Sequence, residues 1–544
     1  MHIVINKSTH GKKIYTSVLL RESYRENGKV KKRTIANLSA CSEEEIRAIQ
    51  IALQNKGSLE NLINSDKDIK LEQGLSIGAV WVIAQVAKIL GIDKALGDEF
   101  SGKLAMWQVI ARVFDHGSRL SAVRLASAHD VLNSAGIDKP FNENDLYANL
   151  AWLSDNQEDI ENQLFKHRHN KKPELFLYDV TSSYLEGECN HFGEFGYNRD
   201  KKKGKQQIVI GLVCDQDGAP LSVEVFPGNT QDLATFSSQV DKVAKRFGCE
   251  RATLVGDRGM IKSSQIENLP EGFHFITAIT KPQIESLVSR DVIQLGLFDR
   301  ELCEVSEANV RYILRRNPVR VEEMAKNRQS KYESVVSLLE LKNKYLADHS
   351  KADVSVAAKT VIEKISKFKL NNWLSVELHD RSLKLIESID GLDEMSRLDG
   401  CYVLKTDLSS EHADTKCIHD RYKDLAKVEY AFRTFKNNFL EVRPIFVRKE
   451  KSTCGHVLVV MLAYSIVHYL RKAWYSLNIT VEEGIEQLAT LCETRIIVKG
   501  KSGCLKIPEP RKEIQDMLLA LNLRMPVVLR EGQPHVDTKA KLSR

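Results

Sequence analysis

The segment Glu174–Asp179, ELFLYD, is a short apolar run that ends in a carboxylate. A run of this length and composition predicts a buried β-strand, with Asp179 at its C-terminal end and near solvent. Further along the chain, Thr253–Asp257, TLVGD, repeats the pattern, because it is again a short apolar run closed by an aspartate. The chain therefore offers two carboxylates in the same local setting, Asp179 and Asp257.

The residues between these two strands predict the rest of a sheet. Apolar runs at Gln207–Val213, QIVIGLV, and Leu221–Phe226, LSVEVF, are joined by the turn Asp215–Gly218, which is typical of a hairpin with a longer loop. A helical stretch then leads to the second aspartate-bearing strand. The order strand, hairpin pair, helix, strand is expected of a ribonuclease-H-like core, whose mixed sheet brings the two aspartates together on adjacent strands.

A third carboxylate lies in Arg421–Leu440, RYKDLAKVEYAFRTFKNNFL. Tyr422, Glu429 and Lys436 are seven residues apart in this segment, which is nearly two helical turns, so all three are expected on one face of one helix. Apolar residues at helical spacing form a stripe that packs this helix against a core: Leu425, Val428, Phe432, Phe435 and Phe439. Such a helix holds a carboxylate between two side chains that can donate to phosphate.

These residues resemble the DDE transposases of bacterial insertion sequences, in the branch loosely called the insertion-sequence-four superfamily. The resemblance rests on DVTSSY from Asp179, on GDRGM from Gly256 and on a tyrosine–arginine–glutamate–lysine motif, Y-x2-R-x3-E-x6-K. In this chain the motif positions are occupied by Tyr422, Leu425, Glu429 and Lys436. Together, three acids in this order and context form a specific pattern.

The resemblance covers roughly Leu175 to Tyr469 and extends to RESYRENGKVKKRTIANL near the start of the chain. One position departs from the family pattern, because Leu425 replaces an arginine that relatives use to hold DNA phosphate. Nearby cations can partly take its place: Lys423, Lys427 or Arg433.

The resemblance implies that Asp179, Asp257 and Glu429 are the catalytic residues and the ligands of two Mg²⁺ ions, for which Mn²⁺ can substitute. Two divalent ions can activate a water and stabilise the leaving 3′-oxygen during phosphodiester cleavage. Carboxylate oxygens are the ligands that such hard ions prefer. As in the family, Asp179 and Glu429 are expected at the attacking and leaving oxygens, and Asp257 is expected to bridge the ions.

Several basic and polar residues are expected to contact the DNA backbone. They are Tyr422, Lys436, Arg433 and Arg258, with the loop lysines Lys201, Lys202, Lys203 and Lys205. A lysine-rich loop is as often simply solvated as it is bound, so both interpretations of that loop stay open.

Each acid taken alone has a simpler interpretation as a turn former, a helix cap or a solvated helix residue. The three acids together, in the expected order, favour catalysis. Asp232, in GNTQDLATF, is the chief rival acid, and its place before a helical run favours a helix N-cap.

The predicted fold class is a multidomain α/β protein with a ribonuclease-H-like catalytic core that a large insertion interrupts, preceded by strand-rich and helical domains. An insertion is needed because far more residues separate Asp257 from Glu429 than one strand and its connection require. The predicted domains are 1–70, small, strand-rich and basic; 71–170, helical, for DNA binding or dimerisation; 171–282, the first part of the core; 283–400, the insertion; 401–475, the second part of the core; and 476–544, a helical C-terminal region.

Three flanking patterns support these divisions. Residues 1–70 combine β-forming residues with Gly11 and Gly28, and Lys29–Arg33 adds a basic strip. Apolar residues recur at helical intervals from Ser76 to about Leu153. Cys454–Tyr469 is the most apolar stretch, and because it is shorter than the roughly 20 residues of a membrane span, it predicts a core helix behind the catalytic sheet.

Composition bounds the class of protein. The chain has 544 residues, 42% of them hydrophobic and 28% charged, as expected of several globular domains. A net charge of +6 is too small to indicate nucleic acid by itself. Ten cysteines without metal spacing, and no apolar segment at the N-terminus, predict a cytoplasmic protein that is not bound to a membrane. No P-loop pattern is present, so no nucleotide is expected as a cofactor.

The reaction implied by the resemblance is DNA transposition. The protein is expected to bind the terminal inverted repeats of its element as a homodimer, to cleave beside them by two-metal hydrolysis, and to join the freed 3′-hydroxyl to target DNA by transesterification. Two alternatives stay open: a structure-selective nuclease on the same core, which cuts without joining, and a DNA-binding protein that has kept the fold and lost the chemistry.

Overall fold

The computed structural model describes residues 1–10, 13–57, 69–169, 172–437, 439–443, 445–498, 501–532, 534 and 536. Gly11, which the sequence analysis placed in the strand-rich domain, lies outside the described residues. The protein is a mixed α/β chain with two compact units. The smaller unit comprises Met1–Ser76, Leu491–Pro510 and Met525–Glu531, and the larger one contains Ile77–Thr490 and Arg511–Arg524.

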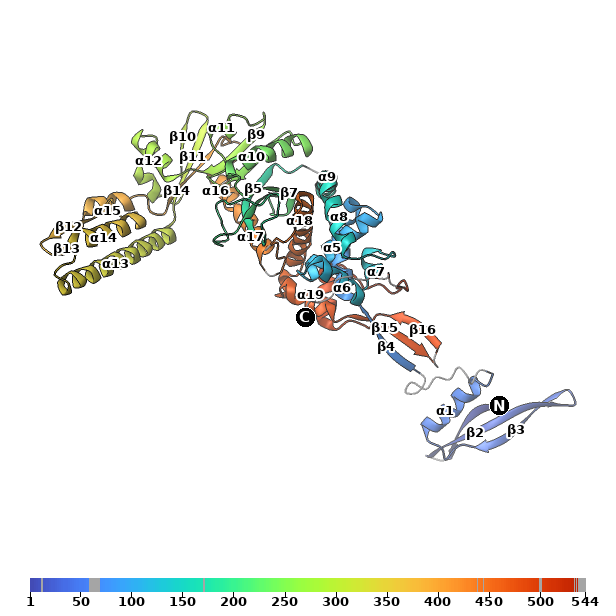
Figure 1. The fold of residues 1–544 in the computed structure, drawn as a ribbon. Coiled ribbons are helices and arrows are strands. Elements are labelled where there is room, and N and C mark those ends of the chain that lie inside the picture. The colour runs from blue at the N-terminus through green and yellow to red at the C-terminus, as the bar shows by residue number, and fades with distance from the viewer. Residues whose placement is uncertain are drawn as a thin grey trace. The chain divides into compact units, whose positions relative to one another are not determined.

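The smaller unit begins with an antiparallel three-stranded sheet (Figure 1). Its elements are β1 (His2–His10), β2 (Lys13–Glu26) and β3 (Lys29–Asn37), followed by α1 (Glu43–Gln54). Asn27 and Gly28 join β2 to β3 with φ values of 53° and 75°, as an Asn-Gly hairpin turn requires. The basic strip Lys29–Arg33 lies on β3 and is exposed.

The same unit holds a second sheet whose strands come from distant parts of the sequence. Its strands are β4 (Ile69–Ser76), β15 (Cys492–Val498) and β16 (Lys501–Lys506), in the order β16-β15-β4. Residues 476–544 were expected to form a helical C-terminal region, and β15 and β16 differ from that expectation. The physical reason is the β-branched run at Ile496–Val498, which pairs with β4.

The larger unit is built on an eight-stranded sheet in the order β10-β11-β14-β9-β8-β5-β6-β7. Its strands are β5 (Leu175–Tyr184), β6 (Gln207–Asp215), β7 (Pro220–Pro227), β8 (Ala252–Gly256), β9 (Phe273–Ala278), β10 (Cys303–Glu307), β11 (Val310–Arg316) and β14 (Cys401–Thr406). The predicted hairpin is confirmed, because β6 pairs with β7 in antiparallel register. Strands β5, β8 and β9 run parallel to one another, and β5 lies directly beside β8.

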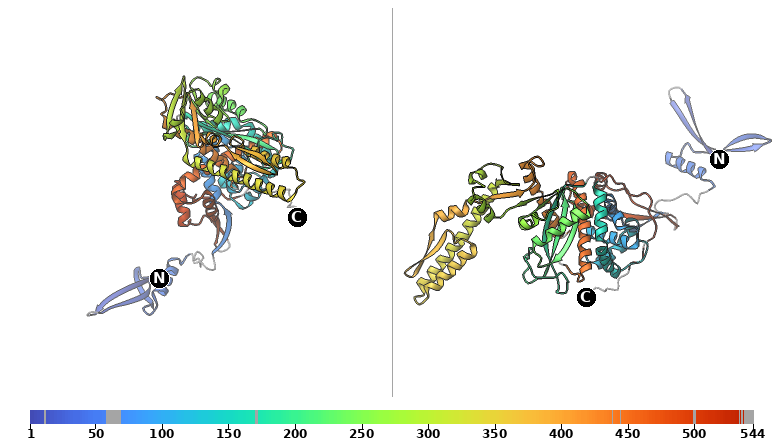
Figure 2. Two further views of the ribbon diagram at one scale, coloured as in Figure 1. Left: turned by 90° about the vertical axis from the view of Figure 1, so that its left-hand side faces the viewer. Right: turned by 90° about the horizontal axis from the view of Figure 1, so that it is seen from above.

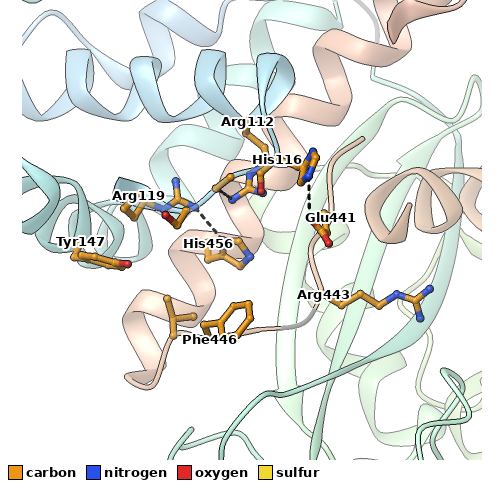
Figure 3. A pocket seen from close by; sticks show the side chains of 11 residues that line it. Arg112, His116, Arg119, Tyr147, Glu441, Arg443, Phe446 and His456 are labelled. Carbon is orange, nitrogen blue, oxygen red and sulfur yellow. Dashed lines mark hydrogen bonds and ion pairs between the residues drawn. The ribbon is translucent and has the colours of Figure 1, made fainter. Parts of the chain in front are cut away.

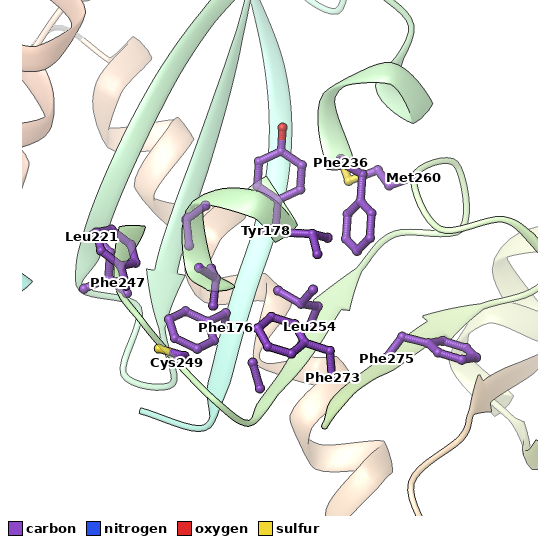
Figure 4. Packing of buried hydrophobic residues seen from close by; sticks show 14 of the residues in the cluster. Phe176, Tyr178, Leu221, Phe236, Phe247, Cys249, Leu254, Met260, Phe273 and Phe275 are labelled. Atoms are coloured by element: carbon purple, nitrogen blue, oxygen red, sulfur yellow. The ribbon is translucent and has the colours of Figure 1, made fainter. Parts of the chain in front are cut away.

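The two faces of this sheet are covered by different helices. Phe176 and Tyr178 on β5 pack with Phe236 of α10 (Asp232–Asp241) and with Met260 in one apolar core (Figure 4). Because neighbouring residues of a strand point to opposite faces, Asp179 projects away from this core. It faces the side on which α17 (Leu425–Lys436) packs against β5.

Helix α18 (Glu450–Ala473) confirms the predicted apolar core helix. It packs against β7, α5 (Phe100–Phe114) and α8 (Glu143–Asp155). Among the described residues it is the one helix long and apolar enough to cross a membrane, and 89% of its most apolar window is buried inside the protein. The helical periodicity predicted from Ser76 to Leu153 is confirmed as well, with α3 (Gly78–Ile89), α4 (Ile92–Leu96), α6 (Arg119–Ala128) and α7 (Val131–Ala135) beside α5 and α8. Helix α9 (Gln157–Arg168) follows them.

Residues 318–396 form a lobe between β11 and β14. The lobe contains α13 (Pro318–Asp348), α14 (Val354–Phe368), β12 (Leu374–His379), β13 (Ser382–Glu387) and α15 (Ile389–Ser396). Helices α13 and α14 lie side by side and share an apolar core with the β12–β13 hairpin (Figure 2). Strands β10 and β11, which also fall within the predicted insertion 283–400, instead extend the main sheet.

Candidate catalytic site

Asp179 lies within β5 rather than at its end, which corrects the sequence-based expectation. The strand continues to Tyr184 because β6 pairs with it along its whole length. Strand β8 stops earlier, and its last pair with β5 joins Gly256 to Tyr178. Asp179 is therefore the first residue of β5 beyond β8, and Asp257 follows β8 directly. Space for the Asp179 carboxylate therefore arises because β8 ends beside it, and not because β5 itself ends there.

Both aspartates are held by local hydrogen bonds. The backbone N–H of Val180 donates to Asp179 Oδ1 at 2.8 Å. The backbone N–H of Arg258 donates to Asp257 Oδ1 at 2.8 Å, and the Tyr422 hydroxyl donates to the same oxygen at 3.3 Å. Each carboxylate is thereby oriented while one of its oxygens takes no part in these bonds.

Glu429 lies on α17, with the apolar stripe of that helix buried on its other side. Its side chain is 61% exposed, and its nearest charged partner is Arg433, with 3.8 Å between Nη2 and Oε2. The single helix predicted for Tyr422, Glu429 and Lys436 is divided in the structure. Tyr422 belongs to α16 (Thr415–Lys423), and Asp424 separates it from α17.

The division at Asp424 has a local cause. Lys427 donates its backbone N–H to the Asp424 carbonyl at 2.9 Å, a bond that spans three residues instead of four. Its ammonium also pairs with the Asp424 carboxylate at 2.8 Å. Aspartate favours such helix ends over helix interiors, because its short side chain competes for backbone groups.

The three acids line the same two adjoining cavities, of about 690 and 730 Å³. Asp179, Asp257 and Glu429 belong to the walls of both. The first cavity is completed by Tyr422, Leu425 and residues at the base of the lobe, and the second by Arg199, Asp232, Lys436 and Arg443. Acids that are far apart in the sequence thus meet on one wall that both cavities share.

This clustering changes the acidity of Asp179. Burial, together with the negative charges of Asp257 and Glu429, raises its pKa to about 7, although the Val180 N–H and Arg199 act in the opposite direction. A carboxylate that ionises reluctantly beside two others marks a place where a cation is stabilising.

The donor chemistry of this wall fits a hard divalent cation, because all three side chains supply carboxylate oxygens. In the part of the chain that the structure describes, no three acidic, histidine or cysteine side chains are grouped closely enough to hold a metal ion. The three carboxylates therefore line a common space without forming a closed shell of ligands.

Two predicted DNA contacts are engaged inside the protein. Burial and the neighbouring Asp257 raise the pKa of Tyr422, whose hydroxyl is bonded to that aspartate. Lys436 is 12% exposed and pairs with Asp200 at 2.9 Å, and Arg443 pairs with the same carboxylate. Burial lowers the pKa of Lys436, although Asp200 opposes this effect.

The other predicted DNA contacts are more open. Arg258 lines the first cavity and Arg433, 71% exposed, lines the second. All four loop lysines, at positions 201, 202, 203 and 205, are exposed between β5 and β6. The ammonium of Lys205 pairs with Glu186 at 2.7 Å, and that of Lys202 lies 5.6 Å from the centre of the Tyr184 ring.

Asp232 is not the helix N-cap that the sequence suggested. Gln231 occupies that position, and Asp232 is the first residue of α10. Both carboxylate oxygens of Asp232 accept from Arg199 at 2.7 Å, and both residues line the second cavity. Sequence reasoning missed Arg199 and Asp200, although an Arg-Asp pair directly before a lysine-rich run was a visible signal.

Two known protein families match parts of this chain. Residues 3–68 match the family described as IS1634 family transposase, N-terminal domain, and residues 170–466, more than half of the chain, match the Transposase DDE domain. No curated protein matches the chain. One solved structure similar to it is the piggyBac transposase synaptic complex with hairpin DNA, with 10% identity, coverage of 81% of this chain and 76% of that chain, and a TM-score of 0.34. The chain belongs to the DDE transposases of insertion sequences, which are enzymes of metal-dependent DNA cleavage and transfer.

Proposed function

We propose that this transposase binds the terminal inverted repeats of its own element, cleaves beside them and joins the freed 3′-hydroxyl to target DNA at one site. The observation that carries the proposal is the shared wall of Asp179, Asp257 and Glu429. These residues come from two strand regions and a helix, yet all three border both cavities. Because the three acids border both cavities, a DNA strand could run from one cavity into the other with its phosphodiester backbone beside the acids.

The topology supports a ribonuclease-H-like core. An antiparallel meander, β5 to β7, is followed by the parallel strands β8 and β9. The domain divisions 1–70, 71–170, 171–282, 401–475 and 476–544 belong to the same proposal, with the insertion expected at 283–400 now narrowed to the lobe, because β10 and β11 extend the main sheet. The lobe with its own apolar core supports an insertion between the two halves of the catalytic core.

The three carboxylates are proposed to hold two divalent ions, Mg²⁺ or in its place Mn²⁺. When bound, such ions lower the pKa of a water and stabilise charge on the leaving oxygen. The Val180 N–H orients the Asp179 carboxylate. The Arg258 N–H and the Tyr422 hydroxyl orient the Asp257 carboxylate. These hydrogen bonds restrict the rotation of both side chains. Glu429, on a helix packed against β5, completes the set.

The cavity walls supply cations for the DNA backbone. Arg258, Lys281, Arg320 and Lys423 border the first cavity, and Arg433 borders the second. Leu425 occupies the position at which relatives carry an arginine, so these neighbours are proposed to hold the phosphates there. Two element ends require two active sites, which supports a homodimer, and the proposed location of the protein is the cytoplasm.

The test uses the full-length protein, Mg²⁺ and DNA that carries the flanking repeats of the element. We expect cleavage at the repeat ends, and strand-transfer products when pre-cleaved ends with a free 3′-hydroxyl are supplied. Asp257→Ala should reduce both reactions at least about a hundredfold, because a carboxylate at the reacting phosphate is lost. The matched control is Asp241→Ala, a carboxylate that is 62% exposed on α10.

The outcomes separate the alternatives. Cleavage without strand transfer would favour a structure-selective nuclease. DNA binding without cleavage by the parent protein, or equal cleavage by Asp257→Ala, would favour a binding protein that has lost the chemistry.

A further inference from the structure

A third cavity, of about 410 Å³, lies outside the catalytic wall, between the helical region before β5 and the segment that joins α17 to α18 (Figure 3). Its wall contains Arg112 at the end of α5, Arg119 at the start of α6, and His456 on α18. A volume of this size falls in the range of sites for small ligands, about 300–1,000 Å³. A double helix cannot enter it, but a single nucleotide can.

Two guanidinium groups form the deep wall of this cavity. Arg112 and Arg119 are only 4% and 5% exposed. Arg112 donates to the carbonyls of His116 at 2.6 Å, Gly117 at 3.2 Å and Leu440 at 3.3 Å, and its Nε is buried with no hydrogen-bond partner among the described residues. Arg119 donates to Gln108 Oε1 at 2.7 Å.

Neither arginine has an ion pair with a carboxylate in the described parts of the chain. A buried charge without a partner is strongly destabilising, and proteins normally pair it or neutralise it. Burial lowers the pKa of Arg112 to about 10, and burial together with the charge of Arg112 lowers that of Arg119 to about 9. The cavity wall therefore carries two buried guanidinium groups without a direct carboxylate partner, although the charges of Asp115 and Glu441, beyond ion-pair distance, partly offset that of Arg112.

His456 does not supply the missing charge. Its Nδ1 lies 3.0 Å from an Arg119 nitrogen. Figure 3 marks this contact with a dashed line, and because a guanidinium group can only donate, the imidazole nitrogen accepts the hydrogen bond. Burial and the two arginines hold the pKa of His456 well below its usual value, so the ring is neutral. Glu441 is also near, but it pairs with His116 at 3.4 Å on the exposed side of the cavity.

The outer part of the cavity is aromatic. Tyr147 is 44% exposed and Phe446 is 70% exposed, and both belong to its wall. Exposed rings beside a positive surface are the combination that holds single-stranded nucleic acid, where bases stack and cations hold the backbone. The cavity thus offers one kind of contact for a phosphate and another for a base.

The third cavity and the second cavity of the catalytic wall share a wall residue. Arg443 borders both this cavity and the second cavity of the catalytic wall. Its segment follows α17, which carries Glu429. A DNA strand that leaves the catalytic wall beside Arg443 would reach the third cavity next.

We propose that this cavity binds one unpaired nucleotide of a DNA strand, with its phosphate against Arg112 and Arg119 and its base against Tyr147 and Phe446. The proposal rests on the proposed function, since it assigns a second contact to the same DNA. A free mononucleotide shares this chemistry, so the experiment must separate the two sources of the phosphate.

The experiment measures binding of a short, labelled single-stranded oligonucleotide to the full-length protein by fluorescence anisotropy, without divalent ions. Arg119→Gln should weaken binding about tenfold or more, because it removes a charged donor to phosphate. Phe446→Ala should weaken it about fivefold or more through lost stacking, and truncating so exposed a ring leaves the fold intact.

Two matched controls carry the same chemical changes elsewhere. Arg124→Gln removes an exposed arginine from the same helix, and Tyr475→Ala removes a ring that is 85% exposed outside the cavity. Both should bind the oligonucleotide within about twofold of the parent protein. Deoxyadenosine monophosphate should compete with the oligonucleotide in the parent protein but much less in Arg119→Gln.

Equal oligonucleotide binding by the parent, Arg119→Gln and Phe446→Ala would overturn the proposal. A second result would also reject the assignment to DNA. The mononucleotide would raise the melting temperature of the parent but not of Arg119→Gln, while both proteins bound the oligonucleotide equally. The cavity would then be a mononucleotide site. Failure of the proposed function gives a different signature, namely cleavage by Asp257→Ala, so the two results cannot be confused.

Discussion

Asp179 determines how the catalytic wall responds to pH when no cation is bound. Its pKa rises from 3.8 to about 7 on folding, first through burial and then through Asp257 and Glu429. A carboxyl group with a raised pKa in the folded state stabilises the fold below its unfolded pKa. This contribution is lost as the pH rises through the folded pKa, here from about pH 4 to pH 7.

We therefore expect the metal-free protein to be less stable to urea at pH 8 than at pH 5 because of this group. The difference is about 3 kcal/mol, because about two units separate pH 5 from the folded pKa and each unit corresponds to 1.36 kcal/mol. Asp179→Asn should remove most of this dependence, and Mg²⁺ should restore stability to the parent at pH 8. If the parent and Asp179→Asn lose stability equally between these two pH values, Asp179 does not have the raised pKa that its burial near Asp257 and Glu429 implies.

Asp200 is a second residue whose environment defines a prediction. Its side chain is 2% exposed and accepts from both Lys436 and Arg443. Asp200→Ala leaves these two cations without that carboxylate, so the free energy of unfolding should fall by about 3 kcal/mol. Asp217→Ala is the matched control, because Asp217 is 65% exposed and lies 3.8 Å from Lys472. It should change stability by less than about 0.5 kcal/mol.

The urea unfolding curves of both variants measure this difference. An Asp200→Ala protein as stable as the control would mean that Lys436 and Arg443 do not depend on Asp200. Lys436 would then be available for the DNA contact expected from the sequence.

At single positions, the sequence could indicate residue types but not their partners. The motif spacing identified Tyr422, Glu429 and Lys436, but the bonds to Asp257 and Asp200 join residues more than a hundred positions apart. Local spacing contains no information on such pairs. The prediction for Asp232 was wrong for the same reason. Its partner Arg199 lies in the loop before β6, so β6 and β7 separate the two residues along the chain.

At the scale of elements, the contact between α18 and α8 is unusually close. A Cβ added to Gly455 on α18 would lie 2.0 Å from the carbonyl oxygen of Leu150 on α8. Backbone atoms cannot move aside as a flexible side chain can, so Gly455→Ala must separate the two helices. Overpacking of this kind costs about 1–3 kcal/mol. Thermal unfolding should show a clearly lower melting temperature.

Gly296→Ala is the control for that substitution. Among the described residues, no atom outside its own local backbone lies within 4 Å of the position that its Cβ would take. Its melting temperature should stay close to that of the parent. A Gly455→Ala protein that melts with the control would show that α8 and α18 have room to adjust, and that the core behind the sheet is looser than the structure indicates.

Most elements were predictable because their signals are local. The apolar runs at β5, β6, β7 and β8, the helical periodicity of α3 and α5 and the apolar stretch of α18 needed no knowledge of distant contacts. The break at Asp424 depends on one short turn that a seven-residue spacing does not reveal. Strands β15 and β4 depend on each other, although more than four hundred residues separate them. Such pairing forms only when the tertiary fold brings the two strands together, so local sequence patterns do not predict it.

At the scale of the molecule, the catalytic wall depends on how the chain returns to the sheet after the lobe. Arg316 at the end of β11 and Cys401 at the start of β14 are direct partners in antiparallel register. Asn317 donates its backbone N–H to the Gly400 carbonyl at 2.8 Å, and Gly400 has a φ of 71°. The residues that enter and leave the lobe are therefore adjacent, in the same way as the two strand ends that a hairpin turn connects.

This geometry predicts the result of removing the lobe. Deletion of residues 318–399 joins Asn317 to Gly400 and creates an Asn-Gly turn of two residues, the connection that an antiparallel pair favours most. The apolar core of the lobe is largely its own, so the shortened protein should still unfold cooperatively, with a lower helical signal in circular dichroism. The three acids remain, because none of them belongs to the deleted segment.

DNA binding should nevertheless weaken, because Arg320, Met324 and Leu398 leave the wall of the first cavity. Loss of one phosphate contact at Arg320 should reduce the slope of log affinity against log salt by about one. Arg320→Gln in the full-length protein is the matched variant and should change the slope equally. A shortened chain that fails to fold would mean that the lobe is an integral part of the catalytic core, whereas an unchanged salt slope in both proteins would remove Arg320 from the path of the DNA.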